Sequence, residues 1–348
     1  MFGLDIFKFI LATEILMFHS RSIGCSYGYV LNHFFFIGAV TMTAFFMLSG
    51  FVNEYSFGGK INCQKTTTLN FYVRRLISVL PGYYFTMVLY DLFVSDLSLG
   101  EILVLLPTEM MGLQSYYSSL FSVGHNGGTW FVSCILLCYA LFPIITQYVE
   151  WIENKTKLLV ILFLTLILFY LPLVTHEFSI TTMYANPFTR FVEYSIGVLL
   201  ASAYKGNQGW NGIVSKKQSI VILLLYILCV FGLVIYVVSN NLPMDYMLYS
   251  IIFLPVWILL IAFMTNIRIH NKGILKIIQF ISEITYDMFL VQFFVWPVIA
   301  YIEKMFDINN FIRIVLSFGL CIGMSSIMHY LFEKPIQLKL RRWLVNDN

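Results

Sequence analysis

The sequence is poor in charge. Asp, Glu, Lys and Arg make up 11% of its 348 residues, whereas soluble domains contain about 25%. A soluble fold could not hide the 59% of residues that are hydrophobic, because much of any folded surface stays in contact with water. A water-soluble enzyme or binding module is therefore excluded, and the bilayer is the expected solvent.

Cysteine is also scarce, and its six positions form no metal-ligand pattern. Cys134 and Cys138 lie four residues apart, but no histidine or third cysteine is near enough in sequence to complete a site. Most of the six lie inside apolar runs, where cysteine behaves as a small hydrophobic residue. We expect neither a metal site nor a disulfide.

Long apolar segments are abundant, and the alternating pattern of a membrane β-barrel is absent, so the predicted fold is an all-α integral membrane protein. The run Glu101–Leu113 is too short to span and is typical of an interfacial or re-entrant piece. The spans use nearly the whole chain, which predicts one domain, residues 1–348, without internal repeats. The ten expected spans are 3–20, 31–52, 76–95, 130–149, 157–174, 188–204, 219–238, 247–264, 282–302 and 312–332.

Lysine and arginine placement orients these spans. With both termini in the cytoplasm, sixteen of the 21 lysines and arginines fall in cytoplasmic loops and two, Arg21 and Lys304, in outer loops, as the positive-inside rule requires. The other three, Lys8, Arg190 and Arg313, fall within spans. Because the basic residues lie in short loops, the net charge of +3 does not indicate nucleic-acid binding. The sixteen are Lys60, Lys65, Arg74, Arg75, Lys155, Lys157, Lys205, Lys216, Lys217, Arg268, Lys272, Lys276, Lys334, Lys339, Arg341 and Arg342.

The first expected span carries four ionisable residues, although each charge near a bilayer centre costs about 2.5–3.5 kcal/mol. Lys8 and His19 are eleven residues apart and share one helix face, with Asp5 close enough to pair with Lys8. This polar face runs for about 16 Å. Glu14 points elsewhere. Snorkelling to the two interfaces would explain the terminal positions but not the shared face, which favours a lined cavity or pathway.

Further ionisable residues mark other spans. Arg74 and Arg75 lie at the cytoplasmic mouth of the third span, where they fit either the positive-inside rule or an anion site. Arg190 and Glu193 lie one turn apart in the outer leaflet, as a local ion pair or a substrate site. Glu333 lies at the cytoplasmic end of the last span.

Taken together, these segments resemble the acyltransferase 3 family of membrane-bound acyltransferases, which includes O-acetyltransferases of bacterial surface glycans. The resemblance covers the chain end to end, with the motifs in order. The matching positions are Leu4, Asp5, Lys8 and His19; FFMLSGF at 45–51, which contains Ser49; Arg74, Arg75, Pro81 and Tyr83; Trp130, Phe131, Tyr139 and Pro143; Arg190, Glu193 and Gly197; Tyr286, Phe289, Leu290 and Gln292; and Glu333 with Pro335.

The sequence departs from the family pattern at several of these positions. Lys8 replaces an arginine, and Gln292 replaces a common histidine. Ser78 stands where a further arginine is frequent, and Ile135 with Leu136 replaces an acidic pair found in a large subgroup. Lysine keeps the charge of arginine but loses its two-pronged hydrogen bonding.

The resemblance implies a multi-pass enzyme of the bacterial cytoplasmic membrane that transfers acetyl from acetyl-CoA to a hydroxyl of a surface polysaccharide or its lipid-linked precursor. His19 would act as general base or carry the acyl group, with Lys8 and Asp5 beside it. The donor, a substrate rather than a bound cofactor, would contact Arg74, Arg75 and Tyr83. Arg190, Glu193 and Trp130 would hold the acceptor or stabilise the transition state, and Ser49, Tyr286, Gln292 and Glu333 would support the site.

Two other functions fit the same sequence. A glycan or lipid transporter or flippase also has many spans and buried charges, although the absence of repeated halves disfavours it. An inactive accessory subunit of polysaccharide assembly is compatible with the substitutions at Lys8 and Gln292. The sequence leaves the oligomeric state, the acceptor sugar and the identity of the acyl group open.

Overall fold

The computed structural model describes residues 1–28, 31–32, 38–61, 65–117, 128–177, 183–207, 209–210 and 246–344, together with five single positions between 224 and 239. Every regular element in these residues is helical. The helices are α1 (Phe2–Ser20), α3 (Gly38–Phe57), α4 (Lys65–Phe93), α5 (Leu99–Met110), α6 (Trp130–Trp151), α7 (Asn154–Glu177), α8 (Pro187–Gly206), α10 (Tyr246–Thr265), α11 (Lys272–Phe306), α12 (Asn310–Ile327) and α13 (Lys334–Leu344), with a π-helix at Met328–Glu333 and short 3₁₀ turns at Arg21–Ile23, Gln114–Tyr116 and Met183–Ala185.

Several helices begin where a polar side chain caps the free backbone N–H groups. Asn186 accepts hydrogen bonds from the N–H groups of Phe188 and Thr189, and the proline that follows it occupies the first helical position of α8. Asn271 and Asn309 cap α11 and α12 in the same way. Ser98 and Glu101 form a reciprocal capping box at α5, and these hydrogen bonds lower the pKa of the Glu101 carboxyl.

Five helical segments in the described residues are long and apolar enough to cross a membrane, and a shorter apolar helix covers Ile252–Thr265. The five are Thr67–Phe93, Trp130–Trp151, Asn154–Leu171, Lys272–Phe306 and Asn310–Leu344. The 12 residues of α5 confirm that this segment is too short to span. The count of ten spans and the orientation of both termini stay predictions, and the expected span 219–238 lies almost wholly outside the described residues.

Where the structure describes the chain, helices lie at the positions of the expected spans, but the ends of several helices differ from the predicted ends. Helix α4 begins eleven residues before the expected start at 76, and α11 begins ten residues before the expected start at 282. Helix α3 continues to Phe57 rather than ending at 52, while residues 33–37 of that expected span are not described. Hydropathy marks only the apolar part of a helix, so it does not predict the polar turns that extend these helices.

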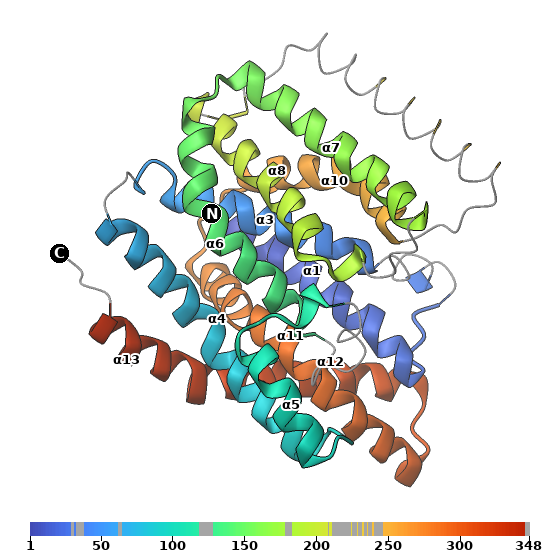
Figure 1. Ribbon diagram of the computed structural model, residues 1–348. Coiled ribbons are helices and arrows are strands. Elements are labelled where there is room, and N and C mark those ends of the chain that lie inside the picture. The colour runs from blue at the N-terminus through green and yellow to red at the C-terminus, as the bar shows by residue number, and fades with distance from the viewer. Residues whose placement is uncertain are drawn as a thin grey trace.

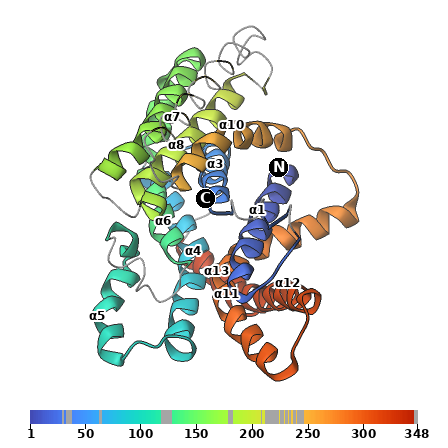
Figure 2. The same ribbon diagram turned by 90° about the vertical axis from the view of Figure 1, so that its right-hand side faces the viewer.

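The helices form two groups joined by α1 and α3 (Figures 1 and 2). Helix α3 packs against α8, α10 and α1, and α8 packs in turn against α6 and α7. On the other side, α1 packs along α11, which packs against α12 and α4. A cavity lies where the two groups meet, and it is lined by residues of α1, α3, α4, α6 and α11.

Two glycines bring α3 and α8 into backbone contact. A Cβ at Gly50 would overlap the carbonyl oxygen of Tyr194, and a Cβ at Gly197 would overlap that of Met47. The side chain of Asn53 also donates a hydrogen bond of 2.7 Å to the hydroxyl of Tyr194. Close backbone approach at small residues is a common way of packing helices in membranes. The glycines of two sequence motifs therefore hold the scaffold together.

We predict that Gly197→Ala destabilises the protein by about 1–3 kcal/mol, because the added methyl group forces α8 away from α3. Thermal unfolding in detergent micelles, followed by tryptophan fluorescence, measures the loss. Gly323→Ala is the matched control, because a Cβ on that glycine of α12 meets nothing within 4 Å. Equal melting temperatures for the two variants would contradict the close-packing role.

Candidate functional site

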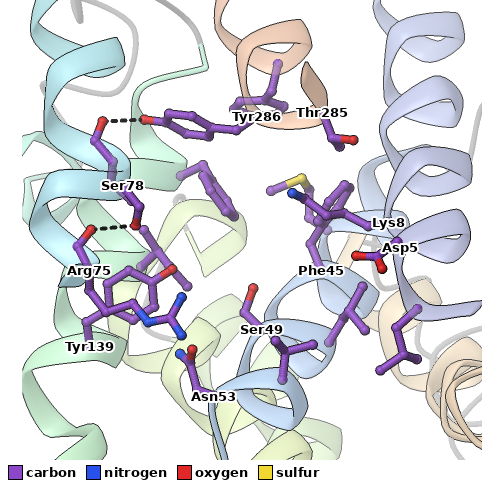
Figure 3. Close-up of a pocket in the computed structure, with 18 residues that line it drawn as sticks. Asp5, Lys8, Phe45, Ser49, Asn53, Arg75, Ser78, Tyr139, Thr285 and Tyr286 are labelled. Carbon is purple, nitrogen blue, oxygen red and sulfur yellow. Dashed lines mark hydrogen bonds between the residues drawn. The ribbon is translucent and has the colours of Figure 1, made fainter. Parts of the chain in front are cut away.

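The cavity between the two helix groups has a volume of about 310 Å³. Figure 3 shows Lys8 of α1 and Arg75 of α4 on opposite sides of it. Its walls combine both cations with polar neutral groups and a larger apolar surface. The polar lining consists of Asp5, Lys8, Ser49, Asn53, Arg75, Ser78, Tyr139, Thr285 and Tyr286.

Lys8 and Asp5 are held by α11 at one residue, Ser282. The ammonium of Lys8 donates to the Ser282 carbonyl at 3.1 Å, and the Ser282 hydroxyl donates to the Asp5 carboxylate at 3.0 Å. We expected Asp5 and Lys8 to pair directly, but the structure joins them through Ser282 instead. Since an ammonium has three N–H groups and Ser282 accepts one, two remain for a ligand in the cavity.

Arg75 lies against aromatic rings. Its guanidinium carbon is 4.8 Å from the ring centre of Phe57 and 5.7 Å from those of Phe71 and Tyr139. Its Nε is buried without a hydrogen-bond partner. Ring contacts of this kind hold a guanidinium in place without consuming its N–H donors. The aromatic rings thus position the Arg75 cation at the wall of the cavity.

The other two predicted donor-binding residues do not line this cavity. Tyr83 is fully buried, donates to the carbonyl of Glu109 at 2.6 Å and accepts a hydrogen bond of 3.3 Å from Gln114. Its hydroxyl therefore holds the last turn of α5 and the segment that follows it. Arg74 neighbours Arg75 on α4 but is absent from the cavity wall.

His19 lies near the other end of α1, eleven residues and about 16 Å from Lys8. Its Nδ1 is 3.0 Å from the side-chain oxygen of Gln292 on α11. The imidazole also lies against the rings of Phe18 and Phe293, with ring centres 5.2 and 5.4 Å away. The polar face predicted for the first helix therefore meets α11 at both ends.

Glu14, the fourth ionisable residue of α1, lies on another face. It is buried in a second recess together with Thr13, Met17, Trp257 and Leu260. The placement confirms that Glu14 points away from the face shared by Lys8 and His19. Glu14 does not line the cavity between the two helix groups.

Arg190 and Glu193 form a fully buried ion pair of 2.8 Å on α8. The guanidinium also donates to the carbonyl of Tyr184 at 2.8 Å, and the carboxylate accepts from the hydroxyl of Thr43 at 2.9 Å. Trp130 covers the guanidinium, with its ring centre 5.5 Å away. The pair ties α8 to α3 and is not part of the cavity wall.

A second polar cluster was not anticipated from the sequence. Nδ1 of His329 lies 3.0 Å from a carboxylate oxygen of Asp287 and 3.1 Å from one of Glu333. The only sequence signal is that His329 precedes Glu333 by four residues, and a π-helix carries both. Ser49 and Tyr286, which we expected to support the site, line the cavity, whereas Glu333 belongs to this cluster.

In the described part of the chain, the same three residues are the group that could hold a metal ion, with ligand atoms within 4.8 Å of one another. Three such ligands would suit zinc. The Nδ1–H of His329, shared between the two carboxylates, satisfies the same contacts without an ion. We therefore assign no metal to this cluster.

Comparison with known proteins now adds to the geometry. The acyltransferase 3 family model, described as an acyltransferase domain, matches residues 1–330. The chain belongs to the acyltransferase 3 family. No curated protein and no solved structure matches it. The apolar helices and the family together make it a multi-pass membrane acyltransferase.

For this acyltransferase 3 protein, the geometry separates three sets of motif residues. Asp5, Lys8, Arg75, Ser49 and Tyr286 face the cavity. His19 and Gln292 meet at the far end of the α1 polar face, whereas a third set packs the scaffold. Those scaffold residues are Gly50, Tyr83, Trp130, Arg190, Glu193 and Gly197.

We predict that Glu193→Gln lowers the stability of the acyltransferase by about 3–5 kcal/mol, because it leaves the buried Arg190 guanidinium without its counter-charge. Thermal unfolding of the purified protein measures this. Glu303→Gln is the control: its partner is Arg313 and its side chain is 36% exposed, so a loss of about 0–1 kcal/mol is expected. A Glu193→Gln protein that melts normally but fails to transfer acyl groups would instead assign Glu193 to the acceptor.

Proposed function

We propose that this acyltransferase transfers an acetyl group from cytoplasmic acetyl-CoA to a hydroxyl of a surface polysaccharide or its lipid-linked precursor. One observation carries the proposal: a single face of α1 links a cavity with two cations to a histidine about 16 Å away. Acetyl-CoA is anionic at its nucleotide end and reactive at the far end of a flexible arm. The two cations at one end of the α1 polar face would bind the anionic nucleotide end, and His19 at the other end would act at the thioester.

The cationic cavity suits the phosphates of the donor. Lys8 and Arg75 supply N–H donors with full positive charge, and hydrogen bonds from such groups to phosphate are stronger than neutral ones. A volume of about 310 Å³ falls at the lower end of typical ligand sites, so it would take part of the donor rather than all of it. The apolar lining that would contact the arm consists of Met42, Phe45, Leu48, Val52, Phe131, Ile135 and Phe289.

His19 supplies the chemistry at the other end of α1. Its imidazole takes the proton of the acceptor hydroxyl while the hydroxyl oxygen bonds to the thioester carbon. The C–S bond then breaks, and CoA leaves as a thiolate that recovers the proton from the imidazolium. The same ring nitrogen could accept the acetyl group first and pass it to the acceptor.

The scaffold role of Arg190 and Glu193 limits what is proposed for them. Their hydrogen bonds to Tyr184 and Thr43 use most of their polar atoms, so direct recognition of the acceptor is not included here. The proposed location is the cytoplasmic membrane of a bacterium, with donor and acceptor approaching from opposite faces. Membrane lipids, the acyl-CoA and the glycan are the proposed partners, and nucleic acid is not among them.

We predict that His19→Ala reduces acetyl transfer about 10²- to 10⁴-fold at matched expression, because the proton-accepting group is lost. Membranes containing the full chain are incubated with radiolabelled acetyl-CoA, and label is counted in the glycan and in the protein. His270→Ala is the matched control, because that histidine is exposed in the segment between α10 and α11.

Wild-type transfer by the His19→Ala protein would remove His19 from the chemistry. Movement of pre-labelled glycan across the membrane, without transfer of acetyl by the wild-type chain, would identify a transporter or flippase instead. A deletion strain that retains both acetyl transfer and glycan transport would instead indicate an accessory role in polysaccharide assembly.

A further inference from the structure

The side chain of Gln292 is held at both ends. Its Nε2 donates a hydrogen bond of 2.9 Å to the carbonyl of Phe289, and its Oε1 lies 3.0 Å from Nδ1 of His19. The side chain is 1% exposed. A flipped amide would place its oxygen against the Phe289 carbonyl oxygen, and two acceptors repel each other. The amide therefore has one favourable orientation.

This orientation determines which nitrogen of His19 carries hydrogen. An amide oxygen only accepts hydrogen bonds, so the Nδ1 atom that faces it must donate. A neutral imidazole has a single N–H, and placing it on Nδ1 leaves the lone pair on Nε2. The rings of Phe18 and Phe293 pack beside the imidazole and offer no competing acceptor in its plane.

We propose that Gln292 is a positioning residue that holds His19 in the tautomer with hydrogen on Nδ1, so that Nε2 is the atom that attacks or deprotonates. The inference deepens the proposed function and rests on the role given there to His19. Gln292 acts on the acceptor only through the imidazole. Because the amide is neutral, it fixes the orientation of the ring and stabilises the charged form less than a carboxylate at the same place would.

Two variants separate this role from simple packing. Gln292→Leu keeps a similar size but has no acceptor, so the turnover number should fall about 10- to 100-fold with the KM for acetyl-CoA unchanged. Gln292→Glu keeps the acceptor and adds a negative charge that favours the protonated imidazole. It should retain transfer, with the acid limb of the pH–rate profile moved to higher pH. Gln279→Leu, on the exposed side of α11, is the matched control.

A readout without catalysis tests the tautomer directly. Full-length protein labelled with ¹⁵N-histidine is reconstituted in lipid, and solid-state NMR spectra are compared with those of the His19→Ala protein to identify the His19 signals. We expect a protonated Nδ1 and an unprotonated Nε2 in the wild type, and a mixture of tautomers in Gln292→Leu. A proton on Nε2 in the wild type would overturn the inference.

The two hypotheses fail in different ways. If Gln292→Leu transfers acetyl at the wild-type rate with an unchanged pH profile, the positioning role is wrong although the proposed function stands. If the NMR spectra show the expected tautomer but the wild-type protein transfers no acetyl group, the proposed function is wrong while the inference about the tautomer is supported.

Discussion

The structure depends on how α1 places polar groups inside an apolar bundle. A charged or polar side chain in such surroundings is costly unless another group bonds to it, and α11 supplies the partners. Ser282 binds both Asp5 and Lys8, and Gln292 binds His19. The order of these contacts shows that α1 and α11 run in the same direction. The two contacts fix the register of the helices and align cavity and histidine along one face.

A further set of motif residues forms a support beside this pair of helices. Gly50 and Gly197 allow α3 and α8 to contact each other through their backbones. The Arg190–Glu193 pair of α8 accepts a hydrogen bond from Thr43 of α3 and donates one to the carbonyl of Tyr184, just before α8. Because α3 also forms one wall of the cavity, a rigid α3–α8 contact keeps Ser49 in place opposite α11. Several motif residues that the sequence analysis assigned to catalysis or substrate binding thus make packing contacts in the structure.

The sequence predicted the helical membrane architecture, the family and the shared face of Lys8 and His19, because each follows from periodicity or order along one segment. It could not predict partners on other helices. Ser282 is one serine among many in the sequence, and only tertiary packing places it between Asp5 and Lys8. For the same reason the cluster of Asp287 with His329 was missed, and Tyr83 was assigned to the donor although its hydroxyl donates to the last turn of α5.

The central claim is that the two ends of the α1 polar face do different work, one holding the donor and the other reacting. The most direct test is calorimetric titration of CoA into the full-length protein in lipid nanodiscs, comparing Lys8→Ala with His19→Ala. The account predicts that Lys8→Ala weakens CoA binding about 10-fold or more, because a charged hydrogen bond is lost, whereas His19→Ala leaves it unchanged. Unchanged CoA affinity in Lys8→Ala, or an equal loss in His19→Ala, would contradict it.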